Sequence, residues 1–317
     1  MPPPRLRGGG IILVKREVIL IKGKFSKLLI KNFAEYKWNY LFILPKFLLF
    51  FTFIVIPVIW AFFLAFQEFG IFETKWVGRT NFKEAFTGDL FWIALWNTLR
   101  YTLTVVPAQI FIALVLASLI HPFSRKIQTF FRGAYYFPTV TSVVVISMVW
   151  RWMYTSKGLI NYFISILNLG PINWLGSSNW ALPAIILMSV LTPPGVGIIL
   201  YLAAMDSIPE SLYEAARIDG AGSITSWIRI TLPLIKPTTL YLVVIGTIGS
   251  FQVFTQVLLL TDGGPGYATT TLVHLIYNAA FRDFDFGLAS AHSIILFGIV
   301  LIFAFIQFKF LSTDVEY

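Results

Sequence analysis

Residues 208–237 read IPESLYEAARIDGAGSITSWIRITLPLIKP, a polar and charged stretch set between two long apolar runs. The run before it is Trp180–Met205 and the run after it is Thr238–Thr261, and neither contains Asp, Glu, Lys or Arg. A helix that crosses a bilayer needs about 20 mostly apolar residues. The stretch is therefore predicted to be a loop between two transmembrane helices.

This loop is predicted to fold into two short helices joined at glycines. Pro209, which an acid follows, suits a helix start, because its missing N–H would be unpaired there and acids favour the first turn. Gly220 and Gly222 allow the positive φ that ends a helix. Ser223 is expected to cap the second helix and Pro233 to close it. The residues fit either an element that docks a partner or an amphipathic hairpin at the membrane surface.

Four more apolar runs accompany these two along the chain. The six predicted spans lie near residues 41–67, 97–120, 134–154, 180–205, 238–260 and 287–311. None alternates with the two-residue period of a membrane barrel strand, so the spans are predicted to be helices. Charged residues make up only 12% of the chain, against about 25% in soluble proteins. The predicted fold class is therefore an all-α integral membrane protein.

Basic residues are distributed unevenly between the two sets of connections. The N-terminal tail, the loops 121–133 and 206–237 and the C-terminus hold sixteen, whereas the alternate loops hold five. The positive-inside rule then places both termini in the cytoplasm. The predicted organisation is a basic cytoplasmic tail over 1–40, a six-helix transmembrane domain over 41–312 and a cytoplasmic tail over 313–317.

The net charge of +9 does not indicate a nucleic-acid partner. Nine of the 24 basic residues lie between Arg5 and Lys37, in the tail. No stripe of bases interleaved with stacking aromatic residues is found, so nucleic acid is not expected. The tail is predicted to lie near anionic membrane lipid.

Several kinds of chemistry are excluded by missing residue types and motifs. The chain has no cysteine, which excludes disulfides, Cys-ligated zinc and thiol catalysis. It has no GxxxxGKS or GxxxxGKT loop to hold the phosphates of ATP, so it is not expected to be an ATPase. The chain is predicted to bind neither a metal nor a cofactor of its own.

The polar loop resembles the signature loop of ABC importer permeases. The resemblance rests on Glu214-Ala215-Ala216, then Asp219-Gly220-Ala221, then Ile230-x-Leu232-Pro233 at the family's spacing. In that family the first short helix, the coupling helix, fits a cleft on a cytoplasmic ATPase. The resemblance implies that the docking residues are Glu214, Ala215, Ala216, Asp219, Gly220 and Pro233.

A second stretch is similar to the last outer loop of the sugar-type permeases, those of maltose-type and glycerol-3-phosphate-type importers. It consists of Leu260–Pro265, Thr269–Leu272, Ala280-Phe281 and Phe286–Ala291. The resemblance implies the type I importer permease fold and a multi-pass protein of a prokaryotic plasma membrane. It also implies the partners: a second homologous permease subunit, two ABC ATPase subunits that use ATP and Mg, an extracytoplasmic solute-binding protein and a carbohydrate-like substrate.

The fourth span is predicted to break near its middle, at Thr192-Pro193-Pro194-Gly195. Two prolines remove two backbone donors, and broken backbone at mid-membrane is tolerated where it faces protein or a water-filled cavity. Transporters build midplane sites at such breaks. A simple packing kink is the alternative.

The fifth span carries Gln252 and Gln256, which share one face of a continuous helix. Neutral amides beside an aromatic ring suit a sugar, although hydrogen bonds between helices are the alternative. The resemblance to maltose-type permeases implies these substrate-path residues: Thr192, Pro193, Val196, Phe251, Gln252 and Thr255.

Other transport and enzyme classes lack their sequence features. A stand-alone secondary carrier, the alternative function, is expected to hold ionisable groups within its spans, and a channel needs a filter motif or a charged ring. An intramembrane enzyme needs facing acids, a metal cluster or a nucleophile and base. The isolated His274 and His292 are expected to be structural histidines with satisfied hydrogen bonds.

Overall fold

The computed structural model describes residues 36–69 and 74–311. The predicted C-terminal tail and residues 1–35 of the predicted N-terminal tail therefore lie outside the described residues. The described part falls into two compact units that divide between Ala61 and Phe62.

The first unit is a nearly continuous apolar helix. It consists of α2 (Lys37–Phe50), the π-helical turn η1 (Phe51–Val55) and most of α3 (Ile56–Leu64). Pro57 has no N–H for the carbonyl of Phe53, which accounts for the change of register in the preceding turn. Residues 38–64 form one candidate span, and the helix ends three residues earlier than predicted.

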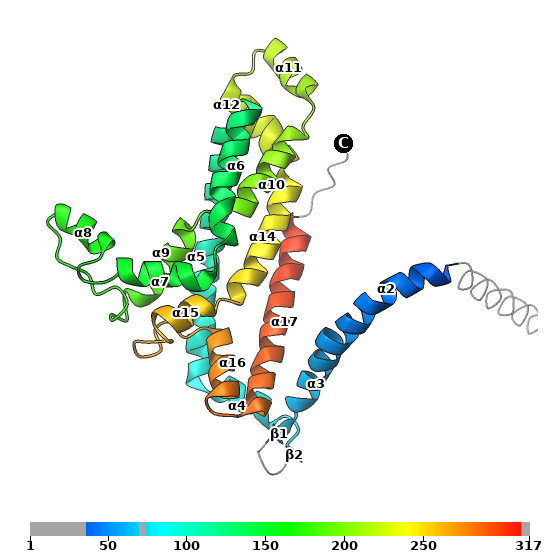
Figure 1. Ribbon diagram of the computed structural model, residues 1–317, viewed down its shortest axis with the longest axis vertical. Coiled ribbons are helices and arrows are strands. Elements are labelled where there is room, and N and C mark those ends of the chain that lie inside the picture. The colour runs from blue at the N-terminus through cyan, green and yellow to red at the C-terminus, as the bar shows by residue number, and fades with distance from the viewer. Residues whose placement is uncertain (1–35, 70–73, 312–317) are drawn as a thin grey trace, which may run out of the picture. The chain divides into compact units, whose positions relative to one another are not determined.

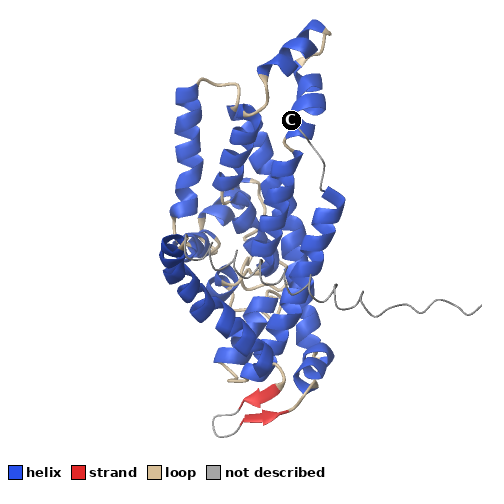
Figure 2. Ribbon diagram, turned by 90° about the vertical axis from the view of Figure 1, so that its right-hand side faces the viewer, coloured by secondary structure: helices blue, strands red, loops and turns tan. Residues whose placement is uncertain are grey.

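The second unit opens with a hairpin at the end of the molecule opposite α11 (Figure 1, Figure 2). Strands β1 (Gln67–Phe69) and β2 (Thr74–Trp76) pair antiparallel, with Gln67 opposite Trp76. Helix α4 (Thr80–Thr87) follows. The Asn81 amide donates to the carbonyls of Ala65 and Gln67, which fixes α4 to the hairpin.

Helix α5 (Asp89–Ile120) is the central helix of the second unit and packs against α9, α10, α14 and α16. It begins eight residues before the predicted span. The extended Gly88 and the acid Asp89 start it early, because a negative charge is favourable at a helix N-terminus. Trp92 and Trp96, which the sequence placed in a loop, therefore lie in the helix.

The third predicted span is wrong as a single helix. The structure has α6 (Arg125–Val140) and α7 (Val143–Met153), bent by 89°. Pro138 removes a backbone donor near the end of α6, and Thr141 is extended. Ser142 then accepts a hydrogen bond from the N–H of Val144 and starts α7. The short helix α8 (Leu159–Ile166) follows.

The fourth predicted span is broken at the expected place. Helix α9 (Ala181–Leu191) and helix α10 (Gly195–Asp206) meet at a bend of 41°. Thr192 has an extended ψ of 116°, as expected for a residue that precedes proline. Gly195 lies so close to the carbonyl of Tyr135 on α6 that a Cβ would clash with it, so this glycine serves packing.

The fifth predicted span is not one helix. Helix α14 (Lys236–Phe251) ends at Phe251, with Gln252 as its C-cap, and α15 (Thr255–Leu260) begins after Phe254. Gln252 and Gln256 therefore belong to different segments, and the prediction that they share one helix face is wrong. Another helical run, made of α12 (Ser223–Ser226), η2 (Trp227–Thr231) and α13 (Leu232–Leu234), is bent by 60° against α14.

The last two helices are α16 (Leu272–Phe281) and α17 (Phe286–Leu311). Helix α17 confirms the sixth predicted span to within one residue. Within the described residues, three helices are long and apolar enough to cross a membrane, or up to six if each bent pair counts as one span. A hydrophobic core cluster joins α5 to α10 through these buried residues: Ala113, Ala117, Ile198, Tyr201 and Leu202.

Candidate functional site

Helix α11 (Glu210–Ile218) and the following helical run form an elbow at one end of the second unit (Figure 1). Gly220 has φ of +82°, Ala221 N–H donates to the carbonyl of Ala216 at 2.8 Å, and Gly220 N–H donates to that of Arg217 at 3.1 Å. These two bonds define a Schellman motif, which closes a helix with a left-handed residue. The predicted turn at Gly220 is confirmed.

Other details of the predicted elbow are wrong. Gly222 has a negative φ of −75° and is itself the N-cap of α12, and Ser223 makes no side-chain capping hydrogen bond. Pro233 lies next to the end of the second helix, whose last residue is Leu234, one residue later than predicted. The π-helical turn η2 ends two residues before Pro233, as η1 ends two residues before Pro57, and this change of register accommodates the missing N–H.

The base of the elbow is tied to the rest of the unit. The hydroxyls of Tyr213 and Thr231 lie 2.8 Å apart and join α11 to η2. The indole N–H of Trp227 donates to the hydroxyl of Ser118 on α5 at 3.1 Å. The elbow is therefore oriented by α5 at its base.

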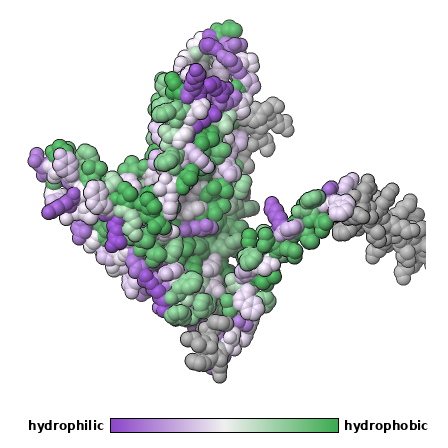
Figure 3. Space-filling model, viewed as in Figure 1, coloured by the Kyte–Doolittle hydropathy of each residue, from purple (hydrophilic) through white to green (hydrophobic). Residues whose placement is uncertain are grey.

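The tip of the elbow, in contrast, is open. Ile218 is 86% exposed and Ile224 is 77% exposed, which is unusual for isoleucine unless a partner covers it. Figure 3 shows hydrophilic side chains around α11 and α12 with a hydrophobic patch at the tip. Of the predicted docking residues, Ala216 is half-buried, and the following are exposed: Glu214, Ala215, Asp219, Gly220 and Pro233.

A charged cluster lies where α10 leads into α11. Asp206 accepts hydrogen bonds from Arg125 at 2.9 Å and Arg132 at 3.0 Å, and its other carboxylate oxygen lies 3.4 Å from Nε2 of His121. These contacts fasten the end of α10 to the connection between α5 and α6.

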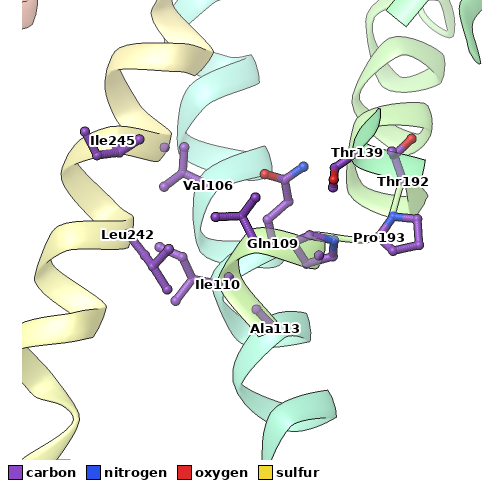
Figure 4. Close-up of a pocket in the computed structure, with 14 residues that line it drawn as sticks. Val106, Gln109, Ile110, Ala113, Thr139, Thr192, Pro193, Leu242 and Ile245 are labelled. Atoms are coloured by element: carbon purple, nitrogen blue, oxygen red, sulfur yellow. The ribbon is translucent and has the colours of Figure 1, made fainter. Parts of the chain in front are cut away.

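A mostly apolar cavity of about 410 Å³ lies at the α9–α10 break (Figure 4). Helices α5, α6 and α14 supply its other walls. Figure 4 shows the Gln109 side chain of α5 between the apolar side chains of α14 and the group formed by Thr139, Thr192 and Pro193. Its full lining is Val106, Gln109, Ile110, Ala113, Thr139, Thr192–Gly197, Leu242, Ile245 and Gly246.

A second, more polar cavity of about 370 Å³ adjoins the first, and Gln109, Thr192 and Gly246 line both. It lies at the break between α14 and α15. Its polar lining comprises Tyr101, Gln109, Ser189, Thr192, Ser250, Gln252, Thr255 and Gln256. Among the described residues, no charged side chain lines either cavity. Hydroxyls and amides there are able to donate and accept hydrogen bonds to a neutral solute.

The predicted substrate-path residues divide between these cavities, with one exception. Thr192, Pro193 and Val196 line the apolar cavity, and Thr192 also lines the polar one with Gln252 and Thr255. Phe251 lines neither cavity. It is fully buried and packs on Phe303 of α17, with ring centroids 5.1 Å apart. Its prediction as a substrate contact is therefore not supported by its position.

Sequence reasoning missed the contribution of α5 and α9. Tyr101, Val105 and Gln109 are spaced four residues apart on α5 and all line the polar cavity. The Tyr101 hydroxyl donates to the Ser189 hydroxyl at 2.8 Å, and the Gln109 amide donates to the Ser189 carbonyl at 2.9 Å. The sequence did carry a signal for this, because Tyr101 and Gln109 are the phenol and the amide of the run 101–120 and lie on one face of the helix.

The segment 261–271 after α15 is held by an ordered polar network. Arg282 donates to both carboxylate oxygens of Asp262, at 2.7 and 2.9 Å, and this guanidinium holds the pKa of the carboxyl below its usual value. His274 is buried and lies 3.2 Å from Asp262, so its prediction as a satisfied histidine is confirmed. His292 differs, because its buried Nδ1 has no hydrogen-bond partner among the described residues.

The described residues contain no group of three or more His, Cys, Asp or Glu side chains able to hold a metal ion. The hydroxyls and amides that line the cavities at the two helix breaks are able to bind a solute reversibly. One break continues through α10 into the exposed elbow.

Comparison with known proteins agrees with this arrangement. The family model for the binding-protein-dependent transport system inner membrane component matches residues 109–313. The trehalose/maltose transport system permease of Thermococcus litoralis is 33% identical over 281 residues, covering 88% of this chain and 95% of that relative. The arabinooligosaccharide transport system permease of Bacillus subtilis is 32% identical over 273 residues, covering 85% and 87%.

A solved structure has the same fold over nearly its whole length. It is a chain of a bacterial ABC transporter involved in the import of the acidic polysaccharide alginate, with a TM-score of 0.78 and 27% identity, covering 90% of this chain and 99% of that one. The chain therefore belongs to the binding-protein-dependent transport system inner membrane component family and is a permease subunit of an ABC importer.

Proposed function

We propose that this chain forms half of the translocation pathway for a neutral saccharide or oligosaccharide. The observation that carries the proposal is the polar cavity between the two helix breaks. Its amides and hydroxyls suit sugar hydroxyls, and the ring of Phe254 in its lining offers an apolar face. The relatives named for trehalose/maltose and for arabinooligosaccharides support a carbohydrate.

The neutral lining of the cavities favours a neutral substrate over an acidic one. An anionic ligand within a membrane protein is stabilised by basic side chains or by helix N-termini. No charged side chain lines either cavity among the residues described, so a uronate or an organic phosphate is disfavoured.

The assembly that we propose contains a second homologous permease subunit, two ABC ATPase subunits and an extracytoplasmic solute-binding protein. A solved relative, 25% identical, is the alginate transporter in complex with its pentasaccharide-bound periplasmic protein, which supports the last partner. We place the elbow and both termini in the cytoplasm of a prokaryote, on the distribution of basic residues. The ATPase subunits bind ATP and Mg, and this chain binds no cofactor.

The proposed cycle uses the exposed elbow as the input. The residues that dock the ATPase are Glu214, Ala215, Ala216, Asp219, Gly220 and Pro233. Closure of the ATPase pair moves α11, and α10 carries that movement to the break at Thr192–Pro194. The cavity is then presented to one side of the membrane or the other, which is alternating access between two states. A stand-alone carrier has no use for such an elbow, and membership of the importer family does not favour it.

The absence of cysteine from the chain allows a direct test with two isosteric substitutions. Ser250 lines the polar cavity and is 8% exposed, whereas Ser290 on α17 lies outside the given linings and is 9% exposed. We expect a transported neutral oligosaccharide to slow thiol labelling of the S250C importer and to leave labelling of S290C unchanged.

The panel of solutes should include neutral di- to tetrasaccharides, alginate oligosaccharides and glycerol 3-phosphate, each also measured for uptake into vesicles. Selective protection by transported neutral sugars supports the proposal. Uptake of a neutral sugar without protection of S250C would show that the cavity is not its site, and uptake of only the acidic solutes would overturn the proposed substrate class.

A further inference from the structure

The two cavities meet at Gln109. Along α5 the polar cavity is lined by Tyr101, Val105 and Gln109, and the apolar cavity by Val106, Gln109 and Ala113, among others. Along α5, residues nearer the elbow therefore line the apolar cavity, and residues nearer the hairpin line the polar one; Figure 1 shows the two ends of this helix. A solute that passes from one cavity to the other passes the Gln109 side chain.

Gln109 also repairs a defect in the backbone of α9. In a continuous helix the carbonyl of Ser189 accepts the N–H of residue 193, which here is proline and has none. The Gln109 amide donates to this carbonyl instead, at 2.9 Å. Without that bond the carbonyl would be left without its partner in a part-buried site, which is unfavourable.

A second contact joins α5 and α9, the helices of Gln109 and Ser189. The Tyr101 hydroxyl donates to the hydroxyl of Ser189, which in turn donates to the carbonyl of Ile185 at 3.0 Å. The last turns of α9 are thus held to α5 on one side of the break. The break at Thr192–Pro194 then separates α9, held to α5 by these polar contacts, from α10, which packs on α5 through apolar side chains.

The far side of the break is connected to the elbow. Helix α10 runs from Gly195 to Asp206 and is followed, after three residues, by α11. It packs on α5 through Ile198, Leu202 and Met205. Movement of α11 therefore reaches the cavities through the break at Thr192–Pro194. Gln109 fixes the α9 side of this break and makes no such bond to the α10 side.

We infer that Gln109 is a positioning residue for transport: it holds α9 to α5 in place of the donor missing at Pro193, so that elbow movement is converted into bending at Thr192–Pro194. Loss of this bond is expected to loosen the hinge, so that ATP hydrolysis depends less on whether a solute occupies the cavities. The inference rests on the proposed function, in which the ATPase moves the elbow and transport is a readout.

The test uses the assembled importer, purified with its partner subunits. Gln109→Met keeps the length of the side chain and removes the donor. We expect a lower Tm without solute, because the Ser189 carbonyl loses its partner. The ratio of stimulated to basal ATPase activity should fall about tenfold, a size typical of a lost coupling between two sites. The KM for uptake should stay within about twofold while kcat falls, since an interaction lost only at the moving step affects kcat.

A double-mutant cycle with Pro193→Ala isolates the missing donor, because alanine no longer holds Thr192 extended and supplies an N–H to the Ser189 carbonyl once α9 continues through residue 193. In that background we expect Gln109→Met to cause no further loss of Tm. Pro193→Ser supplies the same donor if Pro193→Ala does not assemble. An equal loss of Tm in both backgrounds, or a Tm and ATPase ratio of Gln109→Met that match the wild type, would overturn the inference.

Gln256→Met is the matched control. Gln256 is another amide in the lining of the polar cavity, and it lies after the other break. We expect it to raise the KM for the saccharide about fivefold without lowering Tm, as loss of one hydrogen bond to the solute predicts. If Gln109→Met instead reproduces this result, Gln109 is a substrate contact and not a positioning residue. Failure of the saccharide proposal would appear in the S250C experiment and would leave the Tm cycle unaffected.

Discussion

The hydroxyl of Thr271 donates to the carbonyl of Val253 at 3.0 Å, across 18 residues of sequence. Val253 lies in the break between α14 and α15, where a helical partner for its carbonyl is missing. Thr271 is the N-cap of α16 but makes no side-chain bond to that helix, and the hydroxyl of Thr98 accepts the N–H of Leu272 in its place. Thr271, which lies outside the fifth span, therefore holds the break between α14 and α15. Gln252 lines the polar cavity from this break.

Thr271→Val removes this hydroxyl with little change of shape. Because the Val253 carbonyl is then left without its partner, the free energy of unfolding should fall by about 1–3 kcal/mol. Thr271→Ser keeps the donor and should lose less than half as much. Thermal unfolding of the purified complex compares the two, and equal losses would assign the effect to packing of the methyl group.

Gly220→Ala should weaken the elbow through backbone conformation alone. Gly220 has φ of +82°, and nothing lies within 4 Å of a Cβ added there, so the cost is the left-handed conformation, about 1–2 kcal/mol. Gly222 is equally open but has φ of −75°, and Gly222→Ala should be nearly neutral. Proteolysis of the elbow and retention of ATPase on the purified chain measure the difference. Comparable effects of both substitutions would contradict this account.

Glu214→Lys should abolish association with the ATPase and leave membrane insertion intact. Glu214 is exposed on α11, so the change removes a negative charge offered to a partner without disturbing a contact within the chain. Glu84→Lys makes the same change at an exposed position of α4, at the opposite end of the unit, and should leave association unchanged. Co-purification from solubilised membranes is the measurement. Retention of ATPase by Glu214→Lys would remove this residue from the docking site.

The Asp262–Arg282 pair should make a pH-dependent contribution to stability. The guanidinium holds the pKa of Asp262 below its ordinary value of 3.8, so the folded state favours the charged carboxylate. The contribution is complete above about pH 5 and is lost as the pH falls through the lowered pKa.

Asp262→Asn tests this contribution, because asparagine tolerates the positive φ of 50° at this position. The Tm difference between wild type and Asp262→Asn should be present at about pH 7 and shrink below about pH 4. High salt should reduce it as well, because the pair is half exposed. A difference that is constant with pH would show that charge is not its origin.

The sequence predicted best those features that depend on neighbours along the chain. The apolar run 287–311 became α17 almost residue for residue, and the proline pair produced the α9–α10 break at the expected place. The turn at Gly220 followed from the conformational freedom of glycine. The 89° bend between α6 and α7 was missed, because Pro138 gave a weaker signal than the continuous apolar composition around it.

The cavity was harder to predict because hydropathy does not report which side of a helix faces a neighbour. Phe251 and Gln252 are adjacent in sequence, yet the first packs on Phe303 and the second lines the polar cavity. The end of α14 at this point changes the direction of every side chain that follows. A continuous helix was the simplest expectation for an uninterrupted apolar run, and it placed Gln252 and Gln256 on one helix, whereas both line the polar cavity from separate segments.

By itself, the sequence determined that this chain is a helical membrane protein with a polar elbow and at least one broken span, since local apolarity, proline and glycine decide those features. Only the tertiary structure decided how the breaks are held, because the groups that satisfy them come from distant segments: Gln109 reaches Ser189 across 80 residues and Thr271 reaches Val253 across 18. A carbonyl freed in an apolar environment must find a donor, and where that donor lies is a property of packing.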